Sequence, residues 1–183
     1  MKGWLLLLLL ALPAWGHQAS TAFLRLDGNQ GVLELSLMDL ASRLNLDSDA
    51  DGQLTWGEVT QHRAAVAAVV GQGLRFRRGE QPCALSLTGN WQAERHFNEV
   101  FLWLPLRLDC PEAGALALDY RLFSKTPGHK LLLAMAGHPA GMISPGQGEV
   151  ALGQRPLWRV LAEYLLQGVW HIWTGIDLSL IHI

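Results

Sequence analysis

The residues with the clearest chemistry lie in a stretch of twelve that begins at Asp47 and ends at Glu58. This stretch fits the pattern D-x-D-x-D-G-x-L-x-x-x-E, in which oxygen ligands are spaced along a loop that curls around a Ca²⁺ ion. The predicted ligands are Asp47, Asp49, Asp51, Gln53 through its carbonyl, Thr55 through a water, and Glu58. Gly52 stands where the loop must turn sharply. Since every position is filled, we expect the segment 47–58 to bind Ca²⁺, rather than to be an ordinary acidic turn.

The sequence contains one loop of this kind, whereas EF-hands usually occur in pairs. A single loop in an exported domain is expected to bind Ca²⁺ with a dissociation constant of about 10⁻⁴–10⁻³ M. Such weak binding favours a structural role over a sensor.

The first residues have the features of a signal peptide. Within 1–16, an apolar run over 5–12 is followed by the small residues Ala14 and Gly16 at the expected cleavage site. The run is too short to cross about 30 Å of hydrocarbon, which favours cleavage over a membrane anchor. Cleavage after Gly16 makes His17 the first residue, and its amine and imidazole together form a candidate chelate for Cu²⁺.

Export also bears on the two cysteines, Cys83 and Cys110. Each lies in a strand-like stretch, and neither belongs to a C-x-x-C motif. In an oxidising compartment such a pair predicts a disulfide, rather than a metal site or two buried thiols.

The elements expected around the loop are mainly strands. Apolar residues alternate over 20–38, with a turn at 27–31, and again in several runs over 74–133. Helices are expected from Asp39 to Leu46 and over 56–70. The predicted fold is therefore mainly β, an antiparallel sandwich with a two-helix EF-hand-like insertion.

The domain boundaries follow from changes in composition. We expect an exported β domain over 17–140 and a Gly/Pro-rich linker over 141–156, with one last strand at 149–152. The segment 157–177 then reads as an amphipathic helix. Its polar stripe repeats every four residues, at Arg159, Glu163, Gln167 and His171.

The apolar face of this helix carries three tryptophans, which suit a membrane interface or a bundle of further helices. We expect the helix to stay outside the β core, with its apolar face uncovered. The alternative is a soluble amphipathic helix that docks on the sandwich.

The segment 168–177, GVWHIWTGID, resembles the first membrane motif of the HupE/UreJ-like hydrogenase and urease accessory proteins. Three further stretches match that family in order: Asp39-Leu40, the Asp-rich loop with the TWGE at its end, and the YRLF of 120–123 followed by His129. The resemblance implies an exported domain on the periplasmic side, anchored in the inner membrane by several helices. It also implies a role in transport of nickel or another divalent metal, or in metalloenzyme assembly, with His171 and Asp177 as candidate ligands.

Two departures from the family pattern stand out. The stretch 124–128, just before His129, lacks the acidic residue that the family usually has there. The membrane motif also stops at Asp177, where a further His is expected. The last six residues, LSLIHI, are the translation of a transposon-end sequencing adapter, so we interpret 178–183 as adapter sequence fused to a truncated gene.

Composition excludes several other classes of function. With 14 basic against 16 acidic residues, the net charge of −2 argues against nucleic-acid binding, and the 50% hydrophobic content argues against disorder. No nucleophile, phosphate-loop or zinc-protease motif is found, so we do not expect an enzyme. The expected partners are a membrane and metal ions, and no protein partner is indicated. The alternative function is a soluble exported calcium- or copper-binding module without a transport role.

Overall fold

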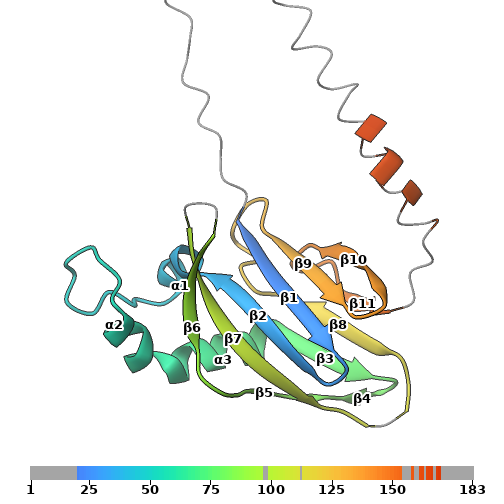
Figure 1. Ribbon diagram of the computed structural model, residues 1–183, viewed down its shortest axis with the longest axis horizontal. Helices are drawn as coiled ribbons and strands as arrows, with labels where there is room; N and C mark the ends of the chain where they lie inside the picture. Colours follow the sequence, from blue (N-terminus) through green and yellow to red (C-terminus); the bar gives the residue numbers. More distant parts are fainter. Residues whose placement is uncertain are drawn as a thin grey trace, which may run out of the picture.

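The computed structural model describes residues 20–96, 99–111, 113–153 and eight positions between 158 and 169. The described part is mainly β, with two sheets and three short helices (Figure 1). The larger sheet has the order β10-β9-β1-β2-β7-β5, and β6 also pairs with β7. The smaller sheet has the order β11-β8-β3-β4.

The strands have the following bounds. The larger sheet contains β1 (Thr21–Asp27), β2 (Gln30–Ser36), β5 (Ala84–Leu87), β6 (Gln92–His96), β7 (Glu99–Asp109), β9 (Lys130–Met135) and β10 (His138–Ile143). The smaller sheet contains β3 (Leu74–Arg78), β4 (Gln81–Pro82), β8 (Leu116–Tyr120) and β11 (Glu149–Ala151).

Both sheets contribute to one hydrophobic core. Leu24 and Leu104 from the larger sheet belong to the same buried cluster as Phe76 and Leu118 from the smaller one. The period-two pattern explains this burial, because successive side chains of a strand point to opposite faces. The mainly β prediction is thus confirmed.

The expectation of purely antiparallel pairing is wrong at one place. β1 and β9 pair in parallel, in a register that runs from Thr21 opposite Lys130 to Leu26 opposite Met135. A parallel pair needs a long connection, and the chain between β1 and β9 includes all the strands of the smaller sheet except β11. No local sequence pattern encodes that pairing.

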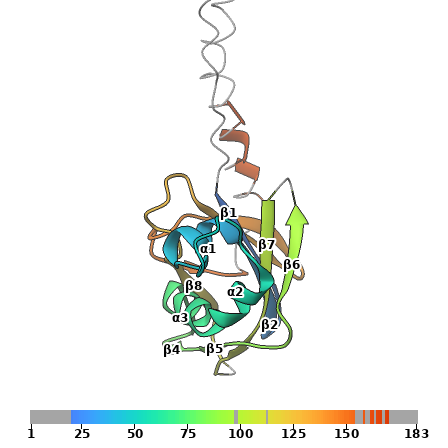
Figure 2. The same cartoon turned by 90° about the vertical axis from the view of Figure 1, so that its left-hand side faces the viewer.

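The three helices lie together at one end of the sheets (Figure 2). They are α1 (Leu37–Arg43), α2 (Trp56–Gln61) and α3 (Arg63–Gly73). α1 starts and ends earlier than predicted, because Ser36 caps it and Leu44 is already extended. The helix expected over 56–70 is two helices, which meet at His62, a residue with non-helical backbone angles.

The linker predicted over 141–156 is in part strand: its first residues belong to β10, and the last strand expected at 149–152 is β11. β10 extends to Ile143 and pairs with β9, while β11 pairs with β8 in the other sheet. Ile143 and Leu152 are both buried in the core. The β domain therefore continues to about Leu152, because Gly and Pro here serve turns inside the fold rather than a boundary.

The predicted disulfide is present between Cys83 and Cys110. Cys83 directly precedes β5 and Cys110 directly follows β7, and these two strands pair. Their Cα atoms are 4.4 Å apart.

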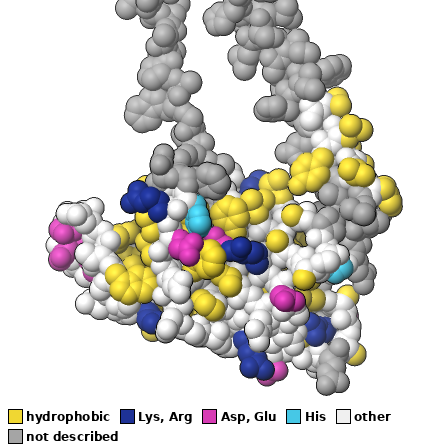
Figure 3. All heavy atoms as spheres, in the orientation of Figure 1, with side chains coloured by type: hydrophobic (Ala, Val, Ile, Leu, Met, Phe, Trp, Pro, Cys, Tyr) yellow, Lys and Arg dark blue, Asp and Glu magenta, His cyan; other side chains and the backbone are white. Residues whose placement is uncertain are grey.

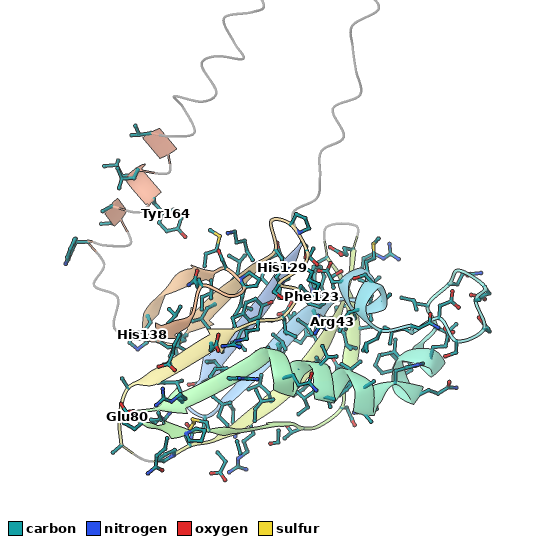
Figure 4. The ribbon with its side chains drawn as sticks, turned by 180° about the vertical axis from the view of Figure 1, so that it is seen from behind. Arg43, Glu80, Phe123, His129, His138 and Tyr164 are labelled. Carbon is teal, nitrogen blue, oxygen red and sulfur yellow. A yellow bond between two sulfur atoms is a disulfide. The ribbon has the colours of Figure 1, made fainter. Side chains whose placement is uncertain are left out.

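Beyond the sheets, the eight described positions between 158 and 169 are helical. Their large apolar side chains, such as those of Leu161, Leu165 and Val169, are exposed. Tyr164 is likewise exposed and lies apart from both sheets (Figure 4). Among the described residues, no helix has both the length and the apolar character that crossing a membrane requires.

Candidate functional site

The predicted calcium loop joins α1 to α2 and projects from the body of the domain (Figure 1). Asp47, Asp49 and Glu58 each place a carboxylate oxygen within 4.8 Å of the other two. Three carboxylates converging in this way form a group that is able to hold a cation.

The turn of the loop is stabilised by its own backbone. Oδ1 of Asp47 accepts a hydrogen bond from the N–H of Asp51 at 3.2 Å, and Oδ2 accepts one from the N–H of Gly52 at 2.9 Å. Ala50 and Gly52 have φ angles of 58° and 80°, in the left-handed region. Gly52 adopts this conformation at no steric cost, which is why glycine belongs at that position.

Glu58 is the buried member of the group, at 7% exposure. Its Oε2 accepts hydrogen bonds from the N–H and the hydroxyl of Thr55, and its Oε1 accepts one from the N–H of Ser48. The hydrogen bonds from Thr55, together with the one from Ser48, hold the pKa of Glu58 below its ordinary value. The carboxylate is therefore ionised at neutral pH.

Of the other predicted ligands, Asp51 lies outside this group of carboxylates, and the Gln53 carbonyl and Thr55 remain predictions. Asp51 is exposed and its Oδ1 accepts a hydrogen bond from the N–H of Gln53 at 2.7 Å. The Thr55 hydroxyl is hydrogen-bonded to Glu58 and caps α2. Leu54 packs against the core, which anchors the end of the loop.

The other predicted site residues lie outside the described part of the chain. They are His17, His171 and Asp177, the candidate ligands for a transition metal. The signal peptide 1–16 and the adapter-like segment 178–183 also lie outside it. The structure does not test these predictions.

A buried histidine, His129, is the main feature that sequence reasoning did not single out as a site, since it named this residue only within the family resemblance. The ring has no exposed side-chain area and lies against Phe123, at 4.9 Å between ring centroids (Figure 4). Its Nε2 is 2.5 Å from the Tyr120 hydroxyl, and its Nδ1 contacts the Ser20 hydroxyl. Ser20 in turn donates to Oδ2 of Asp39 at 2.5 Å.

The proton positions in this network follow from the hydrogen bond between Ser20 and Asp39. The single Ser20 proton goes to Asp39, so Ser20 accepts from the Nδ1–H of His129. Nε2 is then the acceptor, and the Tyr120 hydroxyl donates to it. Burial lowers the pKa of His129 to about 4 and raises the pKa of Tyr120, so both are neutral at pH 7.

Asp39, Tyr120 and His129 belong to stretches named in the family resemblance, and Ser20 does not. Nothing in the sequence shows that these four residues contact one another. Ser20 and His129 are separated by 109 positions, and Ser20 and Asp39 by 19. The parallel pairing of β1 with β9 brings the start of β1 beside His129, which directly precedes β9.

The outer face of the larger sheet carries a groove with mixed chemistry (Figure 3). The Arg25 guanidinium lies 4.9 Å from the ring centroid of Trp103 and forms an ion pair with Glu34. The His96 ring stacks on Trp103, with 6.4 Å between the ring centroids. Apolar, charged and histidine side chains therefore line the same groove.

No model of a known protein family matches the chain, and no curated protein matches it either.

Proposed function

We propose that the β domain binds one Ca²⁺ ion in the loop 47–58 and forms the periplasmic head of a HupE/UreJ-like membrane protein. In this proposal the membrane part handles nickel or a related divalent metal. The observation that carries the calcium site is the convergence of Asp47, Asp49 and Glu58.

The donor set favours Ca²⁺ over transition metals. All three groups offer hard carboxylate oxygens, whereas Ni²⁺, Cu²⁺ and Zn²⁺ favour sites that also contain nitrogen or sulfur. Two oxygens bound to one Ca²⁺ at about 2.3–2.6 Å lie at most about 5 Å apart. The spacing within 4.8 Å therefore fits a single shared ion.

The ion would link the start of the loop to the first turn of α2. Glu58 belongs to that turn, whereas Asp47 and Asp49 follow the extended residues after α1. A ligand that binds only the folded chain stabilises it. At 1 mM Ca²⁺ and a dissociation constant near 0.1 mM, the gain is about 1.4 kcal/mol. This is the size expected of a structural clip.

The test is thermal unfolding of the chain from His17 onwards, in detergent, with increasing Ca²⁺. We expect the unfolding midpoint to rise over the millimolar range. Glu58→Gln should abolish the rise, because it removes the charge but keeps a side chain that is able to cap α2. Glu80→Gln, at an exposed position in the turn between β3 and β4, is the matched control and should keep it. An unchanged midpoint at 10 mM Ca²⁺ contradicts the calcium site.

The membrane part of the proposal rests on the family resemblance and on the exposed apolar side chains between 158 and 169. It is tested by reading the genomic sequence downstream of the codon for Asp177. A histidine codon followed by several apolar spans supports a membrane protein. An early stop codon instead supports the soluble exported calcium- or copper-binding module.

A further inference from the structure

We propose that a groove between α1, α2 and the strands β6 and β7 docks a basic amphipathic helix of a protein partner. The groove lies beside the loop 47–58, and all of its lining residues are described by the structure. The inference goes beyond the calcium site and does not depend on whether Ca²⁺ is bound.

The groove is apolar at its base and is large enough to receive side chains of a partner. Leu37 and Val59 are buried at this base, and Leu54 and Val100 pack against the core beside them. The volume is about 310 Å³, which is near the lower end of the range for binding pockets. The base of the groove is therefore an exposed extension of the hydrophobic core.

Two large apolar side chains line the groove and are exposed. Met38 is 72% exposed and Trp56 is 45% exposed. Over the described residues of 20–153, the other exposed large apolar side chains are Leu132 and Met142. The unbranched side chain of methionine adapts to different apolar surfaces, and tryptophan is enriched among the residues that dominate binding energy. A partner that covers Met38 and Trp56 is therefore stabilised by burying both.

The lining of the groove favours a helix as the bound element. Side chains from two helices form one side, and side chains of β6 and β7, such as that of Val100, form the other. An amphipathic helix binds such a surface by inserting apolar side chains spaced three or four positions apart. Its own backbone groups are already hydrogen-bonded, so it needs no free strand edge.

The groove is adjacent to the acidic loop. Thr55 lines the groove, and its hydroxyl donates a hydrogen bond to Oε2 of Glu58 at 2.8 Å. Figure 3 shows acidic side chains of the loop at the left edge of the molecule, with hydrophobic side chains next to them. A helix that occupies the groove therefore lies within the electrostatic field of the loop.

The loop stays negatively charged with or without the ion. It contains four carboxylates, and one Ca²⁺ ion neutralises the charge of two. Within the groove itself, Arg95 and Glu99 have opposite charges and add no net charge. The partner helix should therefore carry lysine or arginine beside its apolar face, because complementary charge favours its approach and disfavours acidic helices.

The experiment is NMR of the chain from His17 onwards in an uncharged detergent, with ¹³C in the methionine methyl groups. The probe is a synthetic amphipathic helix of leucine and lysine, about 18 residues long so that it is helical by itself. Met38 reports on the groove, and Met135 and Met142 on β9 and β10 are internal controls. We expect the Met38 signal alone to shift in a saturable way. The same helix with glutamate in place of lysine should bind at least about tenfold more weakly.

Two variants separate the groove from nonspecific adhesion. Trp56→Gln removes an exposed apolar contact, and Ala93→Lys places a positive charge on the wall of the groove. Each should weaken binding about tenfold, as read from the Met38 signal. Leu132→Gln, at an exposed position of β9 outside the groove, is the matched control and should leave binding unchanged. All three positions are exposed, so the variants should unfold at the midpoint of the parent chain.

The proposal is overturned if about 1 mM of the basic helix leaves the Met38 signal in place, if Met142 shifts equally, or if both groove variants bind like the parent chain. It is also overturned if detergent alone saturates the shift of Met38, since a lipid surface then covers the groove, or if raising the chain concentration does, since a second copy then covers it. Each titration is run with Ca²⁺ and with a chelator. The calcium site is tested by the unfolding midpoint, so failure of the groove leaves that proposal intact.

Discussion

Oε1 of Glu58 accepts a hydrogen bond from the N–H of Ser48 at 2.7 Å, across ten positions of the chain. The other oxygen of the same carboxylate completes the capping box of α2 with Thr55. One side chain therefore closes the loop and starts the helix. The carboxylate proposed to bind the ion is held in place by hydrogen bonds from both ends of the loop.

The capping role of Thr55 is separable from the calcium role of the loop. Thr55→Ala removes the hydroxyl that accepts from the N–H of Glu58, which should lower the free energy of unfolding by about 1 kcal/mol. The loss should be the same with and without Ca²⁺, as measured by urea unfolding. A variant that loses its Ca²⁺ response as well would show that Thr55 is an essential ligand.

Removal of the disulfide should lower the free energy of unfolding more than removal of a helix cap such as Thr55 does. Cys83 and Cys110 are 27 positions apart, and closing a loop of that length in the unfolded chain is worth about 3–4 kcal/mol. We expect a Cys83→Ser/Cys110→Ser double variant to unfold at a correspondingly lower urea concentration. Reduction of the parent chain with dithiothreitol should give the same midpoint as the double variant, and a midpoint equal to that of the oxidised chain would contradict the prediction.

Two glycines near the end of α3 should respond oppositely to alanine. A Cβ on Gly73 would lie 2.3 Å from Cδ2 of Leu122, a buried side chain, so Gly73→Ala should destabilise the fold by about 1–3 kcal/mol. A Cβ on Gly71 meets nothing within 4 Å, so Gly71→Ala should stabilise it by about 0.5–1 kcal/mol. Differential scanning calorimetry of the two variants separates the steric contact at Gly73 from the effect of alanine on helix propensity. Equal changes in the unfolding temperature would rule out the contact with Leu122.

Burial of His129 predicts a loss of stability in acid for the metal-free chain. Its pKa is about 4 when folded against an ordinary 6.5, so between these values the unfolded state binds more protons. This contribution to stability is complete above pH 6.5, falls as the pH drops from 6.5 to 4, and is lost below pH 4. The total is about 3 kcal/mol. The titratable groups that face the ring are the Tyr120 hydroxyl and the carboxylate of Asp39, 3.8 Å away.

The check is the difference in unfolding free energy between the parent chain and His129→Gln, measured with a chelator from pH 7.5 to 4. This difference cancels the shared titration of the carboxylates. It should shrink as the pH falls, and a constant difference would show that His129 does not titrate in this range.

Local patterns in the sequence predict most of the strands and helices and the candidate calcium loop. The alternation of leucines predicts the hairpin of β1 and β2 and the core faces of both sheets, because burial follows a period of two along a strand. The candidate calcium loop is recognisable because its predicted ligands recur at fixed spacings within twelve residues. The disulfide follows from composition and compartment, since only one pairing exists. The ends of the helices were less predictable, because the cap at Ser36 and the non-helical backbone at His62 are set locally and leave no mark in the hydrophobic pattern.

The tertiary structure alone decides what distant residues do together. The parallel pairing of β1 with β9 and the pairing of β11 with β8 join strands that are far apart in the chain, and no local pattern specifies such connections. These pairings place Ser20 and Asp39 against His129. The carboxylates of the loop 47–58 are encoded by spacing along the chain. The hydrogen-bonded group of Ser20, Asp39 and His129, assembled from two strand ends and a helix, exists only once the sheets have formed, because the packing of the core fixes the distances between its members.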